Sequence, residues 1–453
     1  MIKLNLSEVA EAVGGLLHGT DLTIQSVSTD SRAQENNELF IALKGEKYDA
    51  WDFLASAVKN GARAAVLSRA PEVDIPWVEV PDTTLALGRL GAYVKQKINP
   101  LTAGITGTCG KTTVKDMIFA IMSQVGTTLA TAGNFNNNIG VPLTLLRLDE
   151  SVRYAIVEMG TNHPGELEYS TSLVGEDVCL INNVGYAHLE GFKSLHGVFD
   201  AKYEIFSGLK NGGRAIFCAD SEFAEEFLTR AEADGFRPLT FGSSPAAQVY
   251  PEDLTLLPEG GSRFILCTES IKLPISLHAP GRHNVLNACA SAAVAFCLGA
   301  SAEDVKAGLE SYRPYEGRLK TEKHGHITLI DDTYNASANA VFAAIDVLES
   351  LPGRKIMILG DMGELGDYAQ ELHSKVGRRF SESSGDLLIG LGDLTRYTVA
   401  EAGDKGRFYE DRRELMDHLA GYIPDNEPAV ILIKGSHGMR MGEILNFIRE
   451  NLC

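Results

Sequence analysis

The chain lacks several features that mark common classes of protein. None of its apolar runs approaches the length needed to cross a bilayer, and its first residues lack the long apolar core of a signal peptide. Lys and Arg number 41 against 60 Asp and Glu, a net charge of -19, so the sequence lacks the basic excess that a nucleic-acid backbone requires. We therefore expect a cytoplasmic protein with no membrane span and no nucleic-acid partner.

Cysteine is sparse, and no two cysteines form a C-x-x-C pair. The seven are scattered along the chain: Cys109, Cys179, Cys218, Cys267, Cys289, Cys297 and Cys453. This pattern argues against a disulfide framework and a zinc site, and favours buried, reduced thiols. A G-x-G-x-x-G stretch after a first strand is also missing, so we do not expect a dinucleotide cofactor.

Length and pattern indicate a soluble α/β protein of several domains. With 453 residues, 44% hydrophobic and 22% charged, the chain can form two or three domains with separate cores. Short strands and helices alternate in residues 1–98. The same alternation in residues 99–313 predicts a mostly parallel sheet, and in residues 314–453 it predicts a Rossmann-like unit.

Residues 104–113 (GITGTCGKTT) are the stretch around which the chain is organised. An apolar run precedes them and apolar residues at helical spacing follow, which predicts a strand, a glycine-rich turn and a helix. Such a turn directs backbone N–H groups toward one point at the positive end of a helix, where a phosphate binds. Lys111 is expected to contact the terminal phosphates and the Thr112 hydroxyl to bind magnesium. The alternative is a plain strand-to-helix turn with a solvated lysine.

Two further predicted strands end in groups that suit a metal ion. Glu158 closes the run from Tyr154, and His188 closes the run from Val178. Ligands of open α/β sheets bind at the carboxyl ends of strands, so both groups are expected near the phosphate loop as ligands of a divalent ion. Each could also be an ordinary surface residue. Lys202 follows on a predicted helix, where by itself it is a solvated lysine.

Two polar clusters are ambiguous from the residues alone. Asn284 and Asn287 lie near the start of an alanine-rich helix, predicted from Asn287 to about Leu298. Three residues apart, their amides share one helical face and can pair with an adenine edge, although Asn284 could equally be an N-cap. Residues 28–32 (STDSR) could form an Asx turn or bind a sugar or diphosphate.

Taken together, these stretches resemble the Mur ligase family, ATP-dependent amide-forming enzymes of peptidoglycan precursor synthesis. The resemblance rests on residues 29–32, the phosphate loop, 136–142 (NNNIGVP), 331–336 (DDTYNA) and, above all, 359–366 (LGDMGELG). It implies three domains: 1–98 for the UDP end of the precursor, 99–313 for ATP, and a Rossmann-like 314–453 that closes over the nucleotide. The same motifs favour the branch whose substrates are UDP-N-acetylmuramoyl-tripeptide and D-alanyl-D-alanine, joined through an acyl phosphate. We also expect a monomer.

The resemblance also implies roles for single residues. Residues of the loop bind the ATP phosphates: Gly107, Thr108, Cys109, Gly110, Lys111, Thr112 and Thr113. Further ATP contacts come from Asn138, Asn284, Asn287, Arg318 and Asp332. The magnesium ligands are Thr112, Glu158 and His188, with Lys202 at the position of a lysine that is carbamylated in some relatives. The catalytic set is then Lys111, Glu158, His188, Lys202 and Arg318. The precursor is bound by Asp30, Ser31 and Arg32.

Two positions depart from the family pattern. Cys109 stands where relatives often carry Asn or Ser, a position expected to act through its backbone N–H, and His437 stands where Arg is common.

Three rival functions remain. A sister ligase would add diaminopimelate or lysine, but the Asp-Asn-Pro-Arg stretch common among diaminopimelate enzymes is missing here. A regulatory P-loop ATPase would hydrolyse ATP without an amine acceptor. A non-catalytic UDP-sugar sensor would not need Glu158 or His188.

Overall fold

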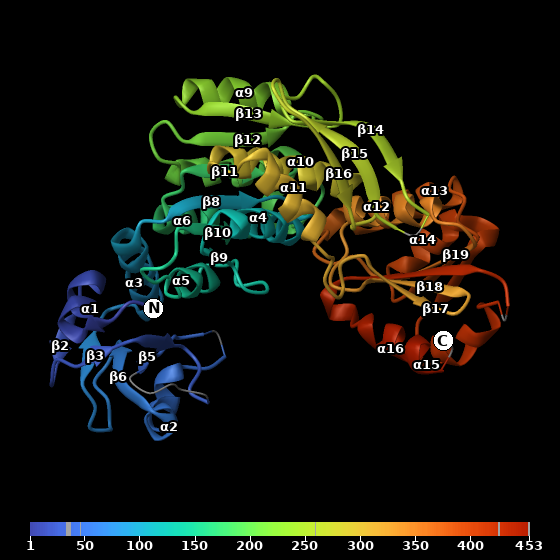
Figure 1. The fold of residues 1–453 in the computed structure, drawn as a ribbon. Coiled ribbons are helices and arrows are strands. Elements are labelled where there is room, and N and C mark those ends of the chain that lie inside the picture. The colour runs from blue at the N-terminus through green and yellow to red at the C-terminus, as the bar shows by residue number, and fades with distance from the viewer. Residues whose placement is uncertain (33–37, 46, 259, 425, 452–453) are drawn as a thin grey trace.

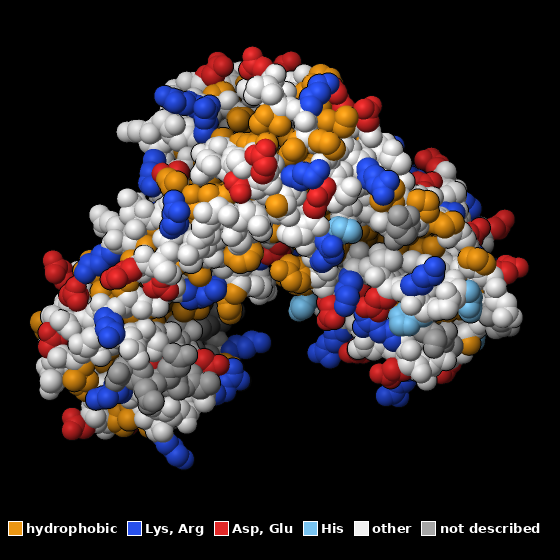
Figure 2. Space-filling view, viewed as in Figure 1, with side chains coloured by type: hydrophobic (Ala, Val, Ile, Leu, Met, Phe, Trp, Pro, Cys, Tyr) orange, Lys and Arg blue, Asp and Glu red, His pale blue; other side chains and the backbone are white. Residues whose placement is uncertain are grey.

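The computed structural model describes residues 1–32, 38–45, 47–258, 260–424 and 426–451. An N-terminal unit (1–98), a central unit (99–313) and a C-terminal unit (314–453) follow one another as the three parts of an arch (Figure 1). Figure 2 shows a hollow beneath the arch, with Lys and Arg side chains on both of its walls. The α/β class with mostly parallel sheets is confirmed, whereas the unit boundaries stay predictions.

The N-terminal unit is built on a five-stranded sheet of order β2-β7-β6-β5-β4, in which only β2 pairs antiparallel. A two-stranded ladder, β1-β3, lies beside it. The strands are β1 (Leu4–Asn5), β2 (Leu16–His18), β3 (Thr23–Ile24), β4 (Ser26–Ser28), β5 (Glu38–Ile41), β6 (Ala62–Leu67) and β7 (Trp77–Glu79). The helices are α1 (Leu6–Val13), α2 (Leu54–Asn60) and α3 (Thr83–Ile98).

The central unit contains an all-parallel six-stranded sheet of order β13-β12-β11-β8-β10-β9. Its strands are β8 (Leu101–Thr106), β9 (Thr128–Ala130), β10 (Tyr154–Glu158), β11 (Val178–Ile181), β12 (Arg214–Cys218) and β13 (Arg237–Phe241). Its helices are α4 (Lys111–Val125), α5 (Gly140–Leu145), α6 (Glu166–Val174), α7 (Leu189–Phe192), α8 (Leu195–Tyr203), α9 (Ala224–Ala233), α10 (Arg282–Cys297) and α11 (Ala302–Ser311). A three-stranded antiparallel sheet, which the sequence analysis did not predict, comprises β14 (Tyr250–Leu256), β15 (Ser262–Cys267) and β16 (Lys272–Leu277).

The C-terminal unit contains a six-stranded sheet of order β17-β18-β22-β19-β20-β21, parallel except for β17. The strands are β17 (Lys320–His324), β18 (Ile327–Asp332), β19 (Arg354–Gly360), β20 (Leu387–Leu391), β21 (Gly406–Tyr409) and β22 (Ala429–Lys434). The helices are α12 (Ala338–Ser350), α13 (Ala369–Ser381), α14 (Thr395–Ala402), α15 (Arg412–His418) and α16 (Gly442–Asn451). Their alternation with parallel strands is the predicted Rossmann-like pattern.

Burial on both faces explains why the parallel strands read as continuous apolar runs. One core joins the N-terminal unit to one face of the central sheet, through Leu90 and Val94 of α3, and a second core covers the other face beneath α4 and α10. Two more cores cover the faces of the C-terminal sheet. Within the described ranges, we find no helix with the length and apolar character of a membrane span.

Two predicted element bounds are wrong. The alanine-rich helix starts at Arg282 rather than Asn287, because Gly281 is its N-cap, so Asn284 lies inside α10 and is not a cap. Strand β11 ends at Ile181, and His188 lies seven positions further on, as the N-cap residue of the short helix α7. The polar Asn182 and Asn183 end the ladder because they bond to the phosphate loop.

Candidate active site

The phosphate loop connects β8 to α4, as the sequence predicts. Gly110 has a left-handed φ of 75° and is the N-cap residue, and Lys111 is the first helical residue. The first N–H groups of an α-helix have no intrahelical acceptors, so the start of α4 is suited to an anion. The Lys111 Nζ donates to the carbonyl oxygen of Gly107 at 2.8 Å, which holds the ammonium over the loop.

Two consecutive asparagines that the sequence analysis missed fix the shape of this loop. The Asn183 side chain accepts a hydrogen bond from the Cys109 N–H at 2.8 Å, and the Asn183 carbonyl accepts one from the Thr108 N–H at 3.1 Å. The Asn182 amide donates to the Cys109 carbonyl at 3.1 Å. The backbone N–H of Cys109, which we expected to bind phosphate, therefore donates to Asn183 instead. The position of Asn182 and Asn183 directly after β11 was the signal that could have revealed their role.

One cleft of about 880 Å³ between the central and C-terminal units gathers most of the predicted site. The predicted residues that line it are Thr108, Cys109, Gly110, Lys111, Thr112, Thr113, Asn138, Glu158, His188, Lys202, Asn284, Asn287, Arg318 and Asp332. The predicted precursor-binding residues, Asp30, Ser31 and Arg32, are not among those that line it; they belong to the N-terminal unit.

Glu158 is the last residue of β10 and is 1% exposed. The Asn136 amide donates to its Oε1 at 2.8 Å, while its Oε2 is buried without a hydrogen-bond partner. A buried carboxylate oxygen without a partner is costly unless a cation or donor satisfies it. This oxygen therefore fits a metal ion at the edge of the cleft.

Lys202 lies on α8 and is 2% exposed. Burial, together with the nearby positive charge of Lys111, lowers the pKa of its ammonium to about 7. Burial likewise lowers the pKa of Lys111, which the Glu158 carboxylate partly opposes. Both lysines are thus buried groups whose positive charge a bound anion would stabilise.

Three polar side-chain contacts join the C-terminal unit to the central unit around the cleft, beside an apolar core that the two units share. Arg318 donates to the Thr112 hydroxyl oxygen at 3.0 Å. His188 Nδ1 lies 2.6 Å from Glu364 Oε2. The Cys109 Sγ lies 3.1 Å from the Ser337 hydroxyl. The two units therefore meet at the phosphate loop and at a predicted metal ligand.

The predicted adenine-side amides form a buried chain. Asn287 donates to the Asn284 Oδ1 at 3.0 Å and accepts from the Asn182 amide at 2.9 Å. Asn284 donates to the Pro280 carbonyl at 2.8 Å. The chain confirms that the two amides share one face of α10 and connects that face to the phosphate loop.

Asp332 is paired within the protein. Its Oδ2 lies 2.5 Å from the Nζ of Lys434, the last residue of β22, and both side chains are buried. The sequence analysis gave Lys434 no role. The pair fixes the carboxyl ends of β18 and β22 beside each other at the cleft.

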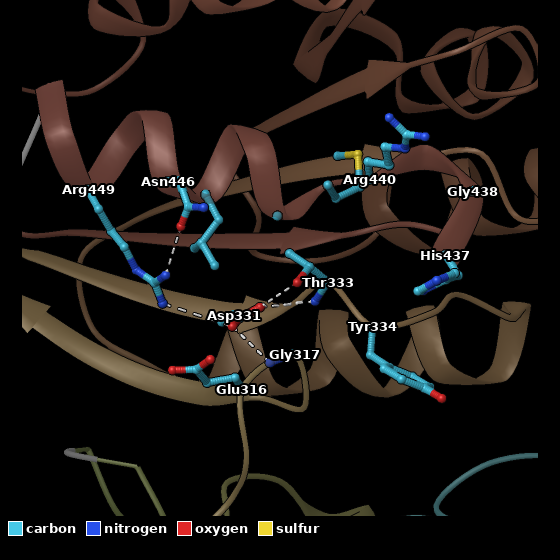
Figure 3. Close-up of a pocket in the computed structure, with 13 residues that line it drawn as sticks. Glu316, Gly317, Asp331, Thr333, Tyr334, His437, Gly438, Arg440, Asn446 and Arg449 are labelled. Atoms are coloured by element: carbon cyan, nitrogen blue, oxygen red, sulfur yellow. Dashed lines mark hydrogen bonds and ion pairs between the residues drawn. The ribbon is translucent and has the colours of Figure 1, made fainter. Parts of the chain in front are cut away.

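A second cavity of about 630 Å³ lies within the C-terminal unit and shares Gly317, Tyr334, His437 and Gly438 with the cleft. Figure 3 shows Asp331 accepting hydrogen bonds from the Gly317 N–H and from Thr333. Tyr334 and His437 lie at the end of the cavity opposite Arg449. His437 therefore lies where the two cavities meet.

The N-terminal polar cluster adopts the turn that composition favours. The Asp30 carboxylate accepts from the Arg32 backbone N–H at 2.9 Å and from the Arg32 guanidinium, which together lower the pKa of Asp30 to about 2. Both side chains remain accessible at the surface. The geometry is an Asx turn, and a role in binding the precursor stays a prediction.

Gly110 gives a first test of the loop. A Cβ there would lie 2.9 Å from the Asn182 amide nitrogen and 2.9 Å from Asn287 Oδ1. We expect Gly110→Ala to weaken ADP binding at least about tenfold. A displacement of the loop that costs ~1.4 kcal/mol of binding free energy is enough for this effect. Gly212→Ala is the matched control, with a similar φ of 77° but no neighbour within 4 Å. Calorimetric titration with ADP makes the comparison, and equal affinity in both variants would contradict this account of the loop.

Comparison with known proteins gives one consistent result. Residues 105–295 match the family model "Mur ligase middle domain", and residues 317–437 match "Mur ligase, glutamate ligase domain". The chain is 39% identical to the UDP-N-acetylmuramoyl-tripeptide--D-alanyl-D-alanine ligase of Escherichia coli, over 100% of this chain and 99% of that protein.

Solved structures agree with the sequence relatives. A MurF crystal structure from Acinetobacter baumannii superposes with a TM-score of 0.95 at 34% identity and covers 100% of both chains. MurF ligase from Thermotoga maritima, solved in complex with ADP, gives a TM-score of 0.84 at 25% identity, over 94% of this chain and 98% of that one. With both family models matched and full-length relatives above 30% identity, the chain belongs to the Mur ligase family.

Proposed function

We propose that this protein is an ATP-dependent ligase that joins D-alanyl-D-alanine to UDP-N-acetylmuramoyl-tripeptide, giving the pentapeptide, ADP and phosphate. The observation that carries the proposal is that Lys111, Glu158 and Arg318 line one cleft between two units. The full-length relatives named for this reaction, and the ADP complex of a relative, support the choice of substrates.

The chemistry explains why such a cleft needs cations. A carboxylate is a poor electrophile, because its leaving group would be oxide. Transfer of the ATP γ-phosphoryl group to a carboxylate oxygen breaks the bond to ADP and forms an acyl phosphate, whose leaving group is phosphate. Attack by the amine then gives a tetrahedral intermediate that loses phosphate and leaves an amide, with one proton released. Two anions must meet in the first step, and the positive charges of Lys111 and Arg318 reduce their repulsion.

The side chains present also fit a magnesium ion. Oxygen ligands suit magnesium, and the partnerless Oε2 of Glu158 and the Thr112 hydroxyl line the cleft. We propose these two as ligands of one ion and His188 as a ligand of a second. Bound magnesium would neutralise charge on the phosphates.

Lys202 has the environment that carbamylation requires. With its pKa lowered to about 7, much of the amine is uncharged at neutral pH, and the uncharged amine adds CO₂ with loss of one proton. The product would be a carboxylate facing the proposed metal site. We expect a carbamate carbon signal in ¹³C NMR of the enzyme under ¹³C-bicarbonate. Its absence in Lys202→Met would confirm the assignment, and its persistence there would refute it.

We further propose that Asp30, Ser31 and Arg32 bind the UDP end of the precursor, since their polar groups lie accessible on the N-terminal unit. The substrates and the six unpaired cysteines among the described residues favour a cytoplasmic enzyme. Cys453 lies outside the described residues. We propose a monomer, because each predicted catalytic group comes from one chain.

The test is a panel of amines. The enzyme, Mg-ATP and UDP-N-acetylmuramoyl-tripeptide are mixed with D-alanyl-D-alanine, D-alanine or diaminopimelate singly, and phosphate release is followed together with product mass. We expect release only with the dipeptide, matched by pentapeptide formation. Release without any amine would favour a regulatory ATPase, and release with diaminopimelate would favour a sister ligase.

A further inference from the structure

Residues 359–366 form the most specific motif of the sequence, yet the function proposed above gives them no role. The segment follows β19, at the carboxyl edge of the C-terminal sheet. The Asp361 carboxylate accepts hydrogen bonds from the N–H groups of Leu394 and Thr395, both at 2.9 Å. The Asp361 carbonyl accepts one from the Ser436 N–H at 3.0 Å. The first half of the segment is thus fixed to two neighbouring loops.

A buried histidine holds the residues nearer the cleft. His373 of α13 accepts a hydrogen bond at Nε2 from the Met362 N–H, at 3.1 Å, and its Nδ1 lies 2.7 Å from the Ala369 carbonyl. These partners define a neutral ring with the proton on Nδ1. Met362 and Leu365 are themselves buried. The backbone on either side of Glu364 is therefore anchored.

Glu364 itself is held in an unfavourable backbone conformation. Its φ is 60°, in the left-handed region that residues with a Cβ rarely adopt. Strain of this kind persists where the surroundings impose it, and it concentrates at functional sites. The conformation places a side chain that is 63% exposed at the wall of the cleft, where its carboxylate contacts His188 across the two units.

The charges around the cleft make this carboxylate distinctive. Four carboxylates line it: Glu158, Glu166, Asp332 and Glu364. Glu158 is buried, Asp332 is paired with Lys434, and Glu166 accepts hydrogen bonds from the backbone of residues 162–163. Among these four described carboxylates, Glu364 has the most exposed side chain, 63% against 43% for Glu166, and its ion-pair partner is the imidazole of His188 on the other unit.

The proposed reaction needs a group of this kind. The amino substrate arrives as an ammonium ion and must approach the phosphate loop, where the ammonium of Lys111 and the guanidinium of Arg318 repel it. A cation in such surroundings needs a counter-charge that the phosphates do not already hold. Glu364 offers one, on the unit whose Arg318 and Ser337 contact the phosphate loop.

We propose that Glu364 binds the ammonium group of the dipeptide and orients its nitrogen toward the acyl phosphate. The inference rests on the proposed function and assigns Glu364 no proton transfer. It gives the 359–366 motif a physical purpose: a rigid loop that presents one negative charge to an incoming amine.

The test compares Glu364→Gln with Glu371→Gln, an exposed glutamate on α13 of the same unit, in the full-length enzyme. We expect Glu364→Gln to raise the KM for D-alanyl-D-alanine about tenfold to hundredfold, the effect of a lost charge-assisted hydrogen bond. The KM values for ATP and for the UDP-tripeptide should stay within about twofold of wild type. Glu364→Asp, which keeps the charge, should give an intermediate KM. N-acetyl-D-alanyl-D-alanine, which has no ammonium, should inhibit wild type and Glu364→Gln equally.

Each other outcome overturns the inference in a distinct way. An unchanged dipeptide KM in an enzyme that still ligates removes the ammonium role and leaves the proposed function intact. A parallel rise in all three KM values, or a change confined to the magnesium requirement, assigns Glu364 to the structure or to the metal site instead. If wild type shows no dipeptide-dependent phosphate release, it is the proposed function that fails.

Discussion

Replacing Lys111 with alanine is expected to abolish phosphate release while leaving the fold intact. The Lys111 ammonium lies at the start of α4 and donates one hydrogen bond to the Gly107 carbonyl. Because the side chain makes this single hydrogen bond, its removal should lower the free energy of unfolding only slightly. A phosphate 4 Å from a unit charge gains about 4 kcal/mol at an effective dielectric constant of about 20. Loss of that interaction corresponds to roughly a thousandfold fall in rate. The rate of phosphate release at saturating substrate concentrations measures this fall.

The control for this variant is Lys375→Ala, which removes a half-buried lysine paired with Glu371 on α13. We expect both variants to share the circular dichroism spectrum of wild type, and only Lys111→Ala to lose activity. Full residual activity in Lys111→Ala would show that the loop at 104–113 does not bind the transferred phosphate.

Replacing Glu158 with glutamine should raise the magnesium requirement. The substitution keeps the size of the side chain and the hydrogen bond from Asn136, but removes the negative charge from the buried oxygen that has no partner. Loss of an outer-shell partner of a metal ligand costs about tenfold to hundredfold in metal affinity, and we expect at least that for a direct ligand. The measurement is phosphate release as a function of magnesium concentration.

Glu168→Gln is the matched control, since Glu168 is an exposed glutamate on the nearby helix α6. Its magnesium titration should overlay that of wild type. An unchanged titration for Glu158→Gln would contradict the assignment of Glu158 as a ligand, whatever its effect on the maximal rate.

The predictable parts of this fold are those set by local pattern. Strands β8, β18, β19 and β22 read as apolar runs because both faces of their sheets are buried. The position of Glu158 at the end of β10 was predictable for the same reason. The loop at 104–113 was predictable because glycine, lysine and threonine act there through local backbone geometry. The antiparallel sheet β14–β16 was missed because its strands alternate between more exposed and more buried positions and so lack the continuous apolar runs of the parallel strands.

What the sequence could not show depends on contacts between distant segments. The roles of Asn182 and Asn183 arise only when β11 lies beside β8, which places their amides against the phosphate loop. The alternative reading of Asn284 as an N-cap was wrong because α10 begins earlier, at Arg282, with Gly281 as its N-cap. The pairing of Glu364 with His188 requires the C-terminal unit to meet the central one, and no spacing along the chain encodes that distance.

The central claim is that the phosphate loop, the carboxylate of Glu158 and the guanidinium of Arg318 act on one nucleotide. A crystal structure of the enzyme with magnesium and a non-hydrolysable ATP analogue tests it most directly. The account predicts the γ-phosphate within hydrogen-bonding distance of Lys111 and Arg318, and a magnesium ion bound to Glu158. A nucleotide seated elsewhere, or phosphates that none of these three side chains approaches, would contradict it.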